Sequence, residues 1–110
     1  MDKQLIREIN RLHAQVCGGL ADPKRIAILY AVADQPRSVT ELAETLEMPQ
    51  ATVSRNLKIL RERGMVIAKR KGPNIYYSLG DKRIIRALDL LREVLADDLS
   101  KRSALADAIA

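Results

Sequence analysis

The side chains best suited to a chemical task form a run of cations and hydrogen-bonding groups in the middle of the chain. Residues 50–71 hold seven Lys or Arg and one Glu, a net charge of +6. The remaining residues together carry −1, so the +5 of the whole chain originates in this segment. Cations attract phosphate oxygens, and polar side chains can hydrogen-bond to base edges. On a helix, which the major groove can admit, the segment predicts contact with double-stranded DNA.

Two groups of residues have different predicted tasks in this contact. The predicted base readers are Gln50, Thr52, Ser54, Arg55 and Asn56. The predicted phosphate contacts are Lys58, Arg61, Lys69, Arg70 and Lys71. Tyr76 is added to the DNA-binding set, because Tyr76 and Tyr77 must point to opposite faces of one strand. The competing interpretation is a solvated basic face on a module that binds another protein and has no specific affinity for DNA.

A second candidate for chemistry is the pair His13 and Cys17, four residues apart on one edge of a predicted helix. This spacing suits a soft metal ion, and the thiol alone could react with an electrophile. Two ligands do not make a metal site, so Asp97, Asp98 or a second subunit would have to complete it. The structural interpretation is favoured: a small core cysteine and an interfacial histidine.

The elements that position the cations follow from prolines, glycines and the spacing of apolar residues. Asp22-Pro23 predicts the start of one helix, and the capping box from Ser38 to Glu41 predicts the start of the next. A tight turn over residues 47–50 leads into a helix from about Ala51 to Arg63. The buried stripe of this helix is predicted to be Val53, Leu57 and Leu60. Two short helices joined by a tight turn form a helix-turn-helix.

A β-hairpin is predicted to follow. The β-prone runs 65–70 and 75–79 flank the turn residues Lys71-Gly72-Pro73-Asn74. A two-stranded ribbon directly after a helix-turn-helix is a wing. The predicted fold class is therefore mainly α with a small β-hairpin, a winged helix-turn-helix in one domain.

Helices at the two ends of the chain are predicted to hold a dimer together. They span about residues 3–19 and 82–99, and an alanine-rich tail over 100–110 follows the 1–99 domain. Their apolar stripes exceed what so small a domain can cover, and a two-fold dimer buries both at once. The predicted interface residues are Leu5, Ile9, Leu12, Val16, Leu88, Leu91 and Leu95.

Charged rows accompany these stripes. Lys3, Arg7 and Arg11 recur every four residues on the first helix, and Asp89, Glu93 and Asp97 do so on the last. We expect the two rows to face each other, within one subunit or between subunits. The acidic row could instead bind a hard cation, although solvated or paired carboxylates are favoured over that.

Composition excludes several classes of protein. One Cys and one His rule out a zinc finger or a disulfide framework within the chain. Three aromatic residues, all Tyr, argue against the stacking platforms of single-strand binders. No phosphate-binding glycine loop or Ser/His/Asp set is present, so no enzyme is predicted. The longest apolar run, Ile26 to Ala33, is too short to span a membrane. We expect a soluble cytoplasmic protein.

Three segments together resemble a known family: LADPKRIAIL, SVTELAETLEMPQATVSRNLKILRERGMV and AKRKGPNIYYSL. They are similar to the ArsR/SmtB family of bacterial winged-helix repressors. The resemblance implies a homodimer paired through its terminal helices, which represses a promoter until an effector releases it. Such symmetry implies a palindromic operator with half-sites about 34 Å apart, or a multiple of that. Asn56 stands where many members carry His.

The resemblance also limits the effector. Metal-sensing members carry cysteines on the first helix of the helix-turn-helix, or an Asp/His set with His and Glu on the terminal helix. Here the first of these helices, VTELAETL, has no Cys, and the terminal helix has no His. An intrachain dithiol also fails, because Cys17 is alone. No cofactor is predicted, and a metal or thiol-reactive effector is the alternative hypothesis.

Overall fold

Three short helices form the centre of the molecule, as the caps of the first two and the proline turn before the third predict. In the computed structural model, which describes residues 1–109, these are α3 (Pro23–Ala31), α4 (Val39–Leu46) and α5 (Gln50–Glu62). The Asp22 carboxylate accepts the Lys24 N–H at 2.8 Å, and the Ser38 hydroxyl accepts the Glu41 N–H at 3.2 Å. The Glu41 carboxylate accepts the Ser38 hydroxyl rather than a backbone N–H.

The core lies between these helices and the base of the hairpin. The predicted stripe of Val53, Leu57 and Leu60 on α5 is fully buried, which confirms the helical spacing. The turn from α4 to α5 has Glu47 in the left-handed conformation (φ 54°), and α5 begins directly after Pro49. The other buried apolar residues are Ile28, Leu29, Val32, Leu42, Met65, Val66 and Leu88.

The hairpin is the predicted wing. Strands β1 (Val66–Lys71) and β2 (Asn74–Leu79) pair antiparallel around Gly72 and Pro73, with Val66 opposite Leu79. The N–H and C=O of Tyr77 exchange hydrogen bonds of 2.8 and 2.9 Å with the backbone of Arg37, and the Tyr77 ring packs against the core. Tyr76 therefore lies on the other face of the ribbon, as alternation predicts.

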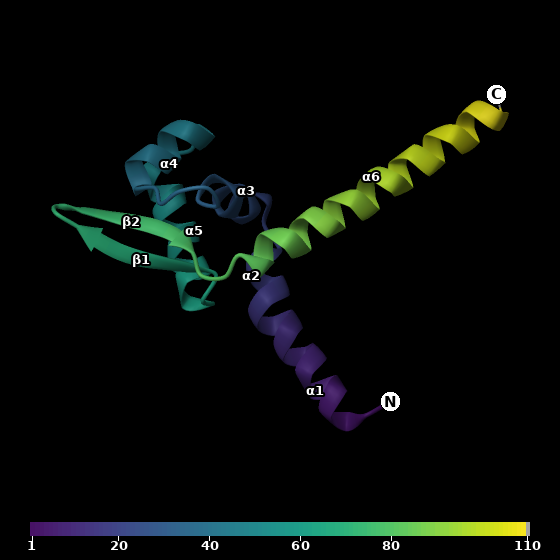
Figure 1. Ribbon diagram of the computed structural model, residues 1–110, viewed down its shortest axis with the longest axis horizontal. Coiled ribbons are helices and arrows are strands. Elements are labelled where there is room, and N and C mark those ends of the chain that lie inside the picture. The colour runs from purple at the N-terminus through teal and green to yellow at the C-terminus, as the bar shows by residue number, and fades with distance from the viewer. Residues whose placement is uncertain (110) are drawn as a thin grey trace.

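The terminal helices diverge from this winged body (Figure 1). The first helix consists of α1 (Lys3–Leu12), a π-helical turn η1 (His13–Cys17) and α2 (Gly18–Leu20). The last helix, α6 (Arg83–Ile109), begins after Asp81, whose carboxylate accepts the Arg83 N–H at 2.9 Å. It continues without a break through most of the segment predicted as a separate tail from residue 100. Alanine is the strongest helix former, so an alanine-rich sequence extends a helix rather than ending it.

A close backbone crossing at the base of the wing requires glycine. The Gly80 N–H donates to the Met65 carbonyl at 2.9 Å, and a Cβ at Gly80 would overlap the carbonyl oxygen of Gly64. Gly64 itself has φ +72°, and a Cβ built there would meet no atom within 4 Å.

We expect Gly80→Ala to lower the free energy of unfolding more than Gly64→Ala does. Alanine at position 64 costs about 1–2 kcal/mol, because the left-handed conformation disfavours a side chain. Alanine at position 80 must push two backbone segments apart, which we expect to cost about 3 kcal/mol. Urea unfolding of both variants measures the difference. Equal or reversed destabilisation would show that the crossing is looser than described.

Candidate nucleic-acid interface

One side of α5 is free for a ligand because the opposite side packs into the core. Gln50, Ser54, Arg55, Lys58 and Arg61 are exposed, and Thr52 is half-buried. The predicted base readers other than Asn56 therefore lie at or near the surface in the first turns of the helix. The major groove of DNA admits one helix in this way, with the first turns nearest the base edges.

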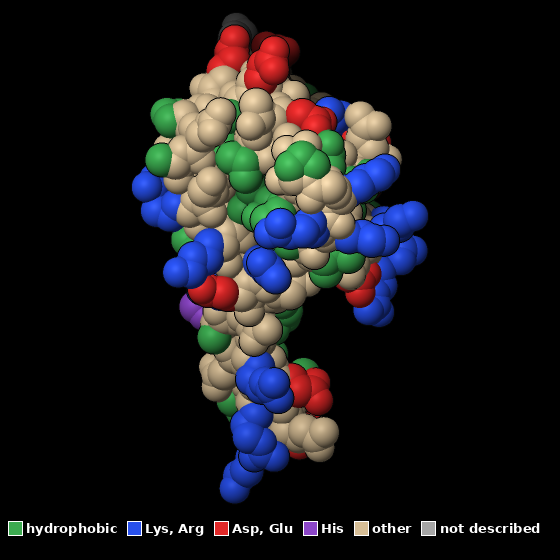
Figure 2. Space-filling model, turned by 90° about the vertical axis from the view of Figure 1, so that its left-hand side faces the viewer, with side chains coloured by type: hydrophobic (Ala, Val, Ile, Leu, Met, Phe, Trp, Pro, Cys, Tyr) green, Lys and Arg blue, Asp and Glu red, His purple; other side chains and the backbone are tan. Residues whose placement is uncertain are grey.

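The wing adds cations beside α5. Lys69, Arg70 and Lys71 are exposed on β1, and Lys69 lies opposite Tyr76 across the ribbon. These four residues line a hollow of about 700 Å³ that is completed by Pro36, Ile67 and Ser78. Figure 2, which views the molecule from the side of the wing, shows Lys and Arg side chains gathered on this face.

The predicted phosphate contacts have no competing anion within the described chain. Within residues 1–109 the ion pairs are formed by Arg25, Arg37, Arg83, Arg92 and Arg102. None of the cations predicted to contact DNA is among them. Binding phosphate would therefore cost these side chains no intramolecular ion pair.

The placement of Asn56 corrects its prediction as a base reader. Its side chain is only 4% exposed, and its amide oxygen accepts a hydrogen bond from Arg25 at 3.1 Å. Its amide nitrogen donates to the Thr52 carbonyl at 2.9 Å. Because Asn56 follows Val53 by three residues and precedes Leu60 by four, it lies on the buried stripe of α5. Both ends of its amide are used inside the protein.

The predicted dimer residues are exposed, with two exceptions. Leu91 and Leu95 are 61% and 58% exposed, and Leu5, Ile9 and Leu12 are also exposed. Val16 is half-buried and packs against the core. Leu88 is 6% exposed and belongs to the core of its own chain, which corrects its assignment to the interface. Further exposed apolar residues on these helices are Ile6, Leu90, Val94, Leu99, Leu105 and Ile109.

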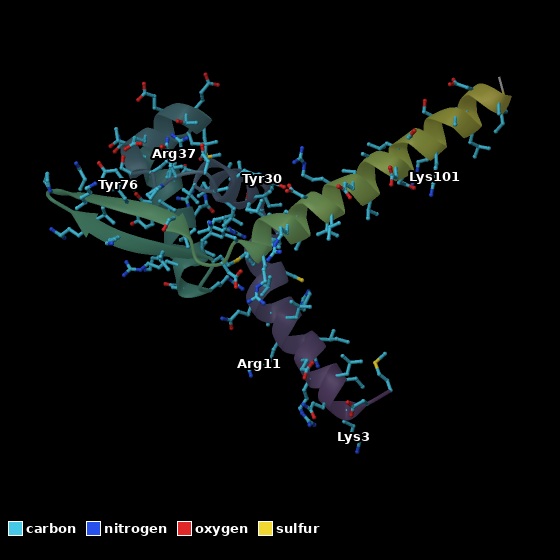
Figure 3. The ribbon with its side chains drawn as sticks, in the orientation of Figure 1. Lys3, Arg11, Tyr30, Arg37, Tyr76 and Lys101 are labelled. Carbon is cyan, nitrogen blue, oxygen red and sulfur yellow. The ribbon has the colours of Figure 1, made fainter. Side chains whose placement is uncertain are left out.

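The two charged rows do not meet within the chain. Lys3 and Arg11 lie on α1, while α6 leads away from it toward Lys101 (Figure 3). Asp89 instead accepts the Tyr30 hydroxyl at 2.6 Å, and the Arg92 guanidinium lies 5.3 Å from the centre of the Tyr30 ring. Burial and then the bond to Asp89 raise the pKa of Tyr30. The intrachain form of the prediction is wrong, because the two helices diverge.

His13 and Cys17 are both exposed and lie at the two ends of the π-helical turn η1. Cys17 is therefore not a core residue of its own chain, contrary to the structural interpretation. Asp98 forms an ion pair with Arg102 at 3.0 Å on α6, which diverges from the first helix. Within residues 1–109 no three metal-ligating side chains come together. A metal at His13 and Cys17 would need ligands from outside this chain.

Comparison with known proteins decides the family. Residues 22–68 match the sequence profile described as "Bacterial regulatory protein, arsR family". Over 96 residues the chain is 36% identical to Rv0081 of Mycobacterium tuberculosis, which is named as an uncharacterized HTH-type transcriptional regulator; the match covers 86% of this chain and 84% of that protein. The chain belongs to the ArsR family. The predicted membership is confirmed, and the relatives of this ArsR-family chain are named as regulators, not enzymes.

A second relative of this ArsR-family chain is the HTH-type transcriptional regulator NmtR of M. tuberculosis. The two are 41% identical over 76 residues, which is 69% of this chain. The match spans 63% of the length of NmtR, less than two thirds.

Solved structures confirm the winged helix-turn-helix fold of this ArsR-family chain. The crystal structure of M. tuberculosis Rv0081 matches 86% of this chain and 95% of its own with a TM-score of 0.76, at 36% identity. A homodimeric winged helix-turn-helix DNA-binding domain, Mb0332 from Mycobacterium bovis, matches 92% of this chain and 93% of its own, with a TM-score of 0.77 and 28% identity. Within residues 1–109, no helix is both long and apolar enough to cross a membrane.

Proposed function

We propose that this ArsR-family chain is a cytoplasmic transcriptional repressor that binds double-stranded DNA as a homodimer. The observation that carries the proposal is the unpaired cationic surface shared by α5 and the wing. α5 enters the major groove with Gln50, Thr52, Ser54 and Arg55 toward the bases. Lys58, Arg61, Lys69, Arg70 and Lys71 contact phosphates, and Tyr76 lies beside the wing cations. The names of the relatives, which are regulators and repressors, support this function.

The dimer in this proposal is two-fold symmetric and uses the terminal helices. Exposed apolar side chains run along α1 and α6 on helices that leave the body of the protein. Large exposed apolar stripes mark interaction surfaces. The homodimeric state of the structural relative Mb0332 supports a second copy as the occupant. The row of Lys3, Arg7 and Arg11 then faces Asp89, Glu93 and Asp97 of the other subunit.

Selection of bound sequences from random duplex DNA tests the function. We expect a palindrome whose half-sites are about 34 Å apart, or a multiple of that, because the dimer presents two equivalent α5 helices. Repeating the selection with zinc, nickel or a persulfide donor tests the alternative hypothesis that a metal or thiol-reactive effector acts at His13 and Cys17. Recovery of random sequences alone would refute a sequence-specific regulator.

Substitutions on α5 and the wing separate base reading from phosphate binding. We expect Arg55→Ala to cost about 1–3 kcal/mol of binding free energy on the selected operator and to relax the preference at one base position. Lys71→Ala should weaken binding to all sequences alike, because phosphates carry no sequence. Fluorescence anisotropy on operator and scrambled duplexes measures both effects. An equal loss on both duplexes for Arg55→Ala would remove its base-reading role.

A further inference from the structure

The first helix is attached to the winged body mainly at its C-terminal end. No residue of α1 is buried, whereas Gly19 in α2 is buried and Val16 and Leu20 pack against the core. Backbone carbonyls near the C-terminal end of a helix attract cations. Two arginines from the winged body donate to carbonyls near this end.

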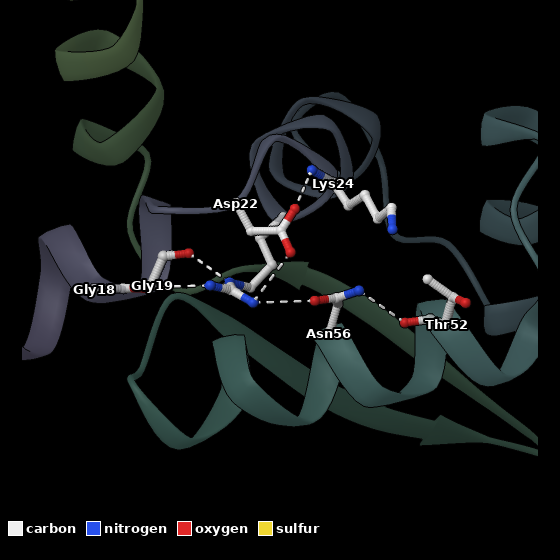
Figure 4. Close-up of polar contacts among 7 residues, drawn as sticks. Gly18, Gly19, Asp22, Lys24, Thr52 and Asn56 are labelled. Atoms are coloured by element: carbon white, nitrogen blue, oxygen red, sulfur yellow. Dashed lines mark hydrogen bonds and ion pairs between the residues drawn. The ribbon is translucent and has the colours of Figure 1, made fainter.

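Arg25, in the first turn of α3, donates hydrogen bonds to the carbonyls of Gly18 and Gly19 (Figure 4). Its Nε donates to the Gly19 carbonyl at 2.8 Å, and one terminal nitrogen donates to the Gly18 carbonyl at 3.3 Å. The other terminal nitrogen donates to the Asn56 amide oxygen at 3.1 Å and lies 3.6 Å from the Asp22 carboxylate. Every nitrogen of the guanidinium group thus has a partner, and the side chain is 13% exposed.

Asn56 extends the hydrogen bonds of Arg25 into α5. Its amide nitrogen donates to the Thr52 carbonyl one turn earlier, so its amide cannot rotate without losing a bond at either end. Thr52 lies between the proposed base readers Gln50 and Ser54. A continuous chain of hydrogen bonds therefore runs from the end of the first helix, through Arg25 and Asn56, to the DNA-facing turns of α5.

Arg63, directly after α5, makes a second attachment. One of its terminal nitrogens donates to the carbonyls of Ala14 and Gln15 in the π-helical turn. The side chain passes so close to α2 that a Cβ at Gly18 would lie 2.9 Å from this nitrogen. A Cβ at Gly19 would lie 2.7 Å from the buried Met65 sulfur. The two glycines therefore allow the first helix to pack closely against Arg63 and Met65.

We propose that Arg25, Asn56 and Arg63 are positioning residues that fix α5 relative to the first helix. The proposal rests on the proposed function, in which the first helix pairs with a second subunit and α5 enters DNA. Two α5 helices can meet successive half-sites only if each is held at one position relative to the dimer helices. Without Asn56 and Arg25, each α5 would sample several positions relative to the first helix. Fixing one of them on binding costs free energy, so the affinity for the operator falls.

The experiment compares Asn56→Ala and Arg25→Lys with a matched control, Arg37→Lys. Lysine at position 25 keeps the charge but cannot reach three acceptors. Arg37 is a similarly enclosed arginine whose Nε donates to the Ala31 carbonyl at 2.6 Å, but its side chain does not connect the first helix with α5. Urea unfolding confirms that each variant is folded under the conditions used.

The first measurement is the distance between spin labels at Gln4→Cys on α1 and Ser54→Cys on α5, in a Cys17→Ser background. Excess unlabelled protein ensures that only labels within one chain are measured. We expect one narrow distribution for the parent and for Arg37→Lys, and broader distributions for Asn56→Ala and Arg25→Lys. Distributions as narrow as that of the parent in both variants would overturn the proposal.

The second measurement is DNA affinity of the unlabelled proteins. We expect Asn56→Ala and Arg25→Lys to bind the selected operator about 3- to 10-fold more weakly and to bind scrambled duplex as the parent does. If a variant were only partly unfolded, its apparent affinity would fall for the operator and for the scrambled duplex alike. Broadened distances with unchanged operator affinity would overturn the link to DNA. If the parent itself shows no preference for any sequence, the proposed function fails, while the distances still decide whether Arg25 and Asn56 fix α5.

Discussion

Raising the salt concentration from 50 to 200 mM is expected to weaken operator binding by about 10³-fold or more. Six unpaired cations of each chain, on α5 and the wing, are placed to contact phosphates or bases. If the dimer neutralises about 6 to 10 phosphates, the logarithm of the binding constant falls with the logarithm of salt with a slope near −5 to −9. Anisotropy titrations on the selected operator at several salt concentrations give the slope.

Single substitutions test whether the cations of α5 and the wing cause this salt dependence. Lys71→Ala removes one proposed phosphate contact from each subunit, so the slope should become shallower by about 2 for the dimer. Lys101→Ala is the matched control, because it removes an exposed cation from the far part of α6. Binding that is insensitive to salt would favour the alternative class, a winged-helix module that docks on another protein.

The helices and the wing could be predicted because their signals are local. Asp22 and Ser38 sit two and three residues from the N–H groups they cap. The hairpin turn needs only Gly72 with its positive φ and the strands on either side of it. Each helix cap or turn depends on residues only a few positions apart, so it can be recognised in the sequence without knowing the fold.

The corrections concern contacts between residues far apart in the chain. Asn56 is polar and stands among predicted base readers, but its acceptor role depends on Arg25, 31 positions earlier. The helical spacing of Asn56 from Val53 and Leu60 was the available signal for its burial. Leu88 continues the same stripe as Leu91 and Leu95, and only the packing of the first turns of α6 on the core separates it from them.

Most of the candidate interface followed from charge and helical position alone. Exposed cations need no tertiary partner, so Arg55, Lys58 and Arg61 lie where the sequence places them. The role of Arg63 was hidden, because its acceptors are backbone carbonyls 48 and 49 positions away. Because every residue has a backbone carbonyl, the sequence does not show which carbonyl accepts a hydrogen bond from Arg63. Such bonds are found only once the fold is known.

The apolar stripe of α6 is the second place where a large effect is expected. Leu95→Asp should convert the dimer to monomers, because it replaces an apolar side chain at two symmetric positions with a charge that the interface would have to bury. Loss of the two leucine contacts alone corresponds to about 3 kcal/mol or more, which is at least about 100-fold in the dimer dissociation constant. Sedimentation velocity over a range of protein concentrations measures the change.

Ser100→Asp provides the matched control on the same helix. Five residues beyond Leu95, Ser100 lies about 140° around the helix axis from it, away from the leucine stripe. Its substitution adds the same charge without touching that stripe and should leave the dimer intact. Because a monomer holds only one half-site, Leu95→Asp should also lose most of its operator affinity while still binding non-specific DNA through α5 and the wing. A dimer that survives Leu95→Asp would mean that this stripe is not the interface and that another surface joins the subunits.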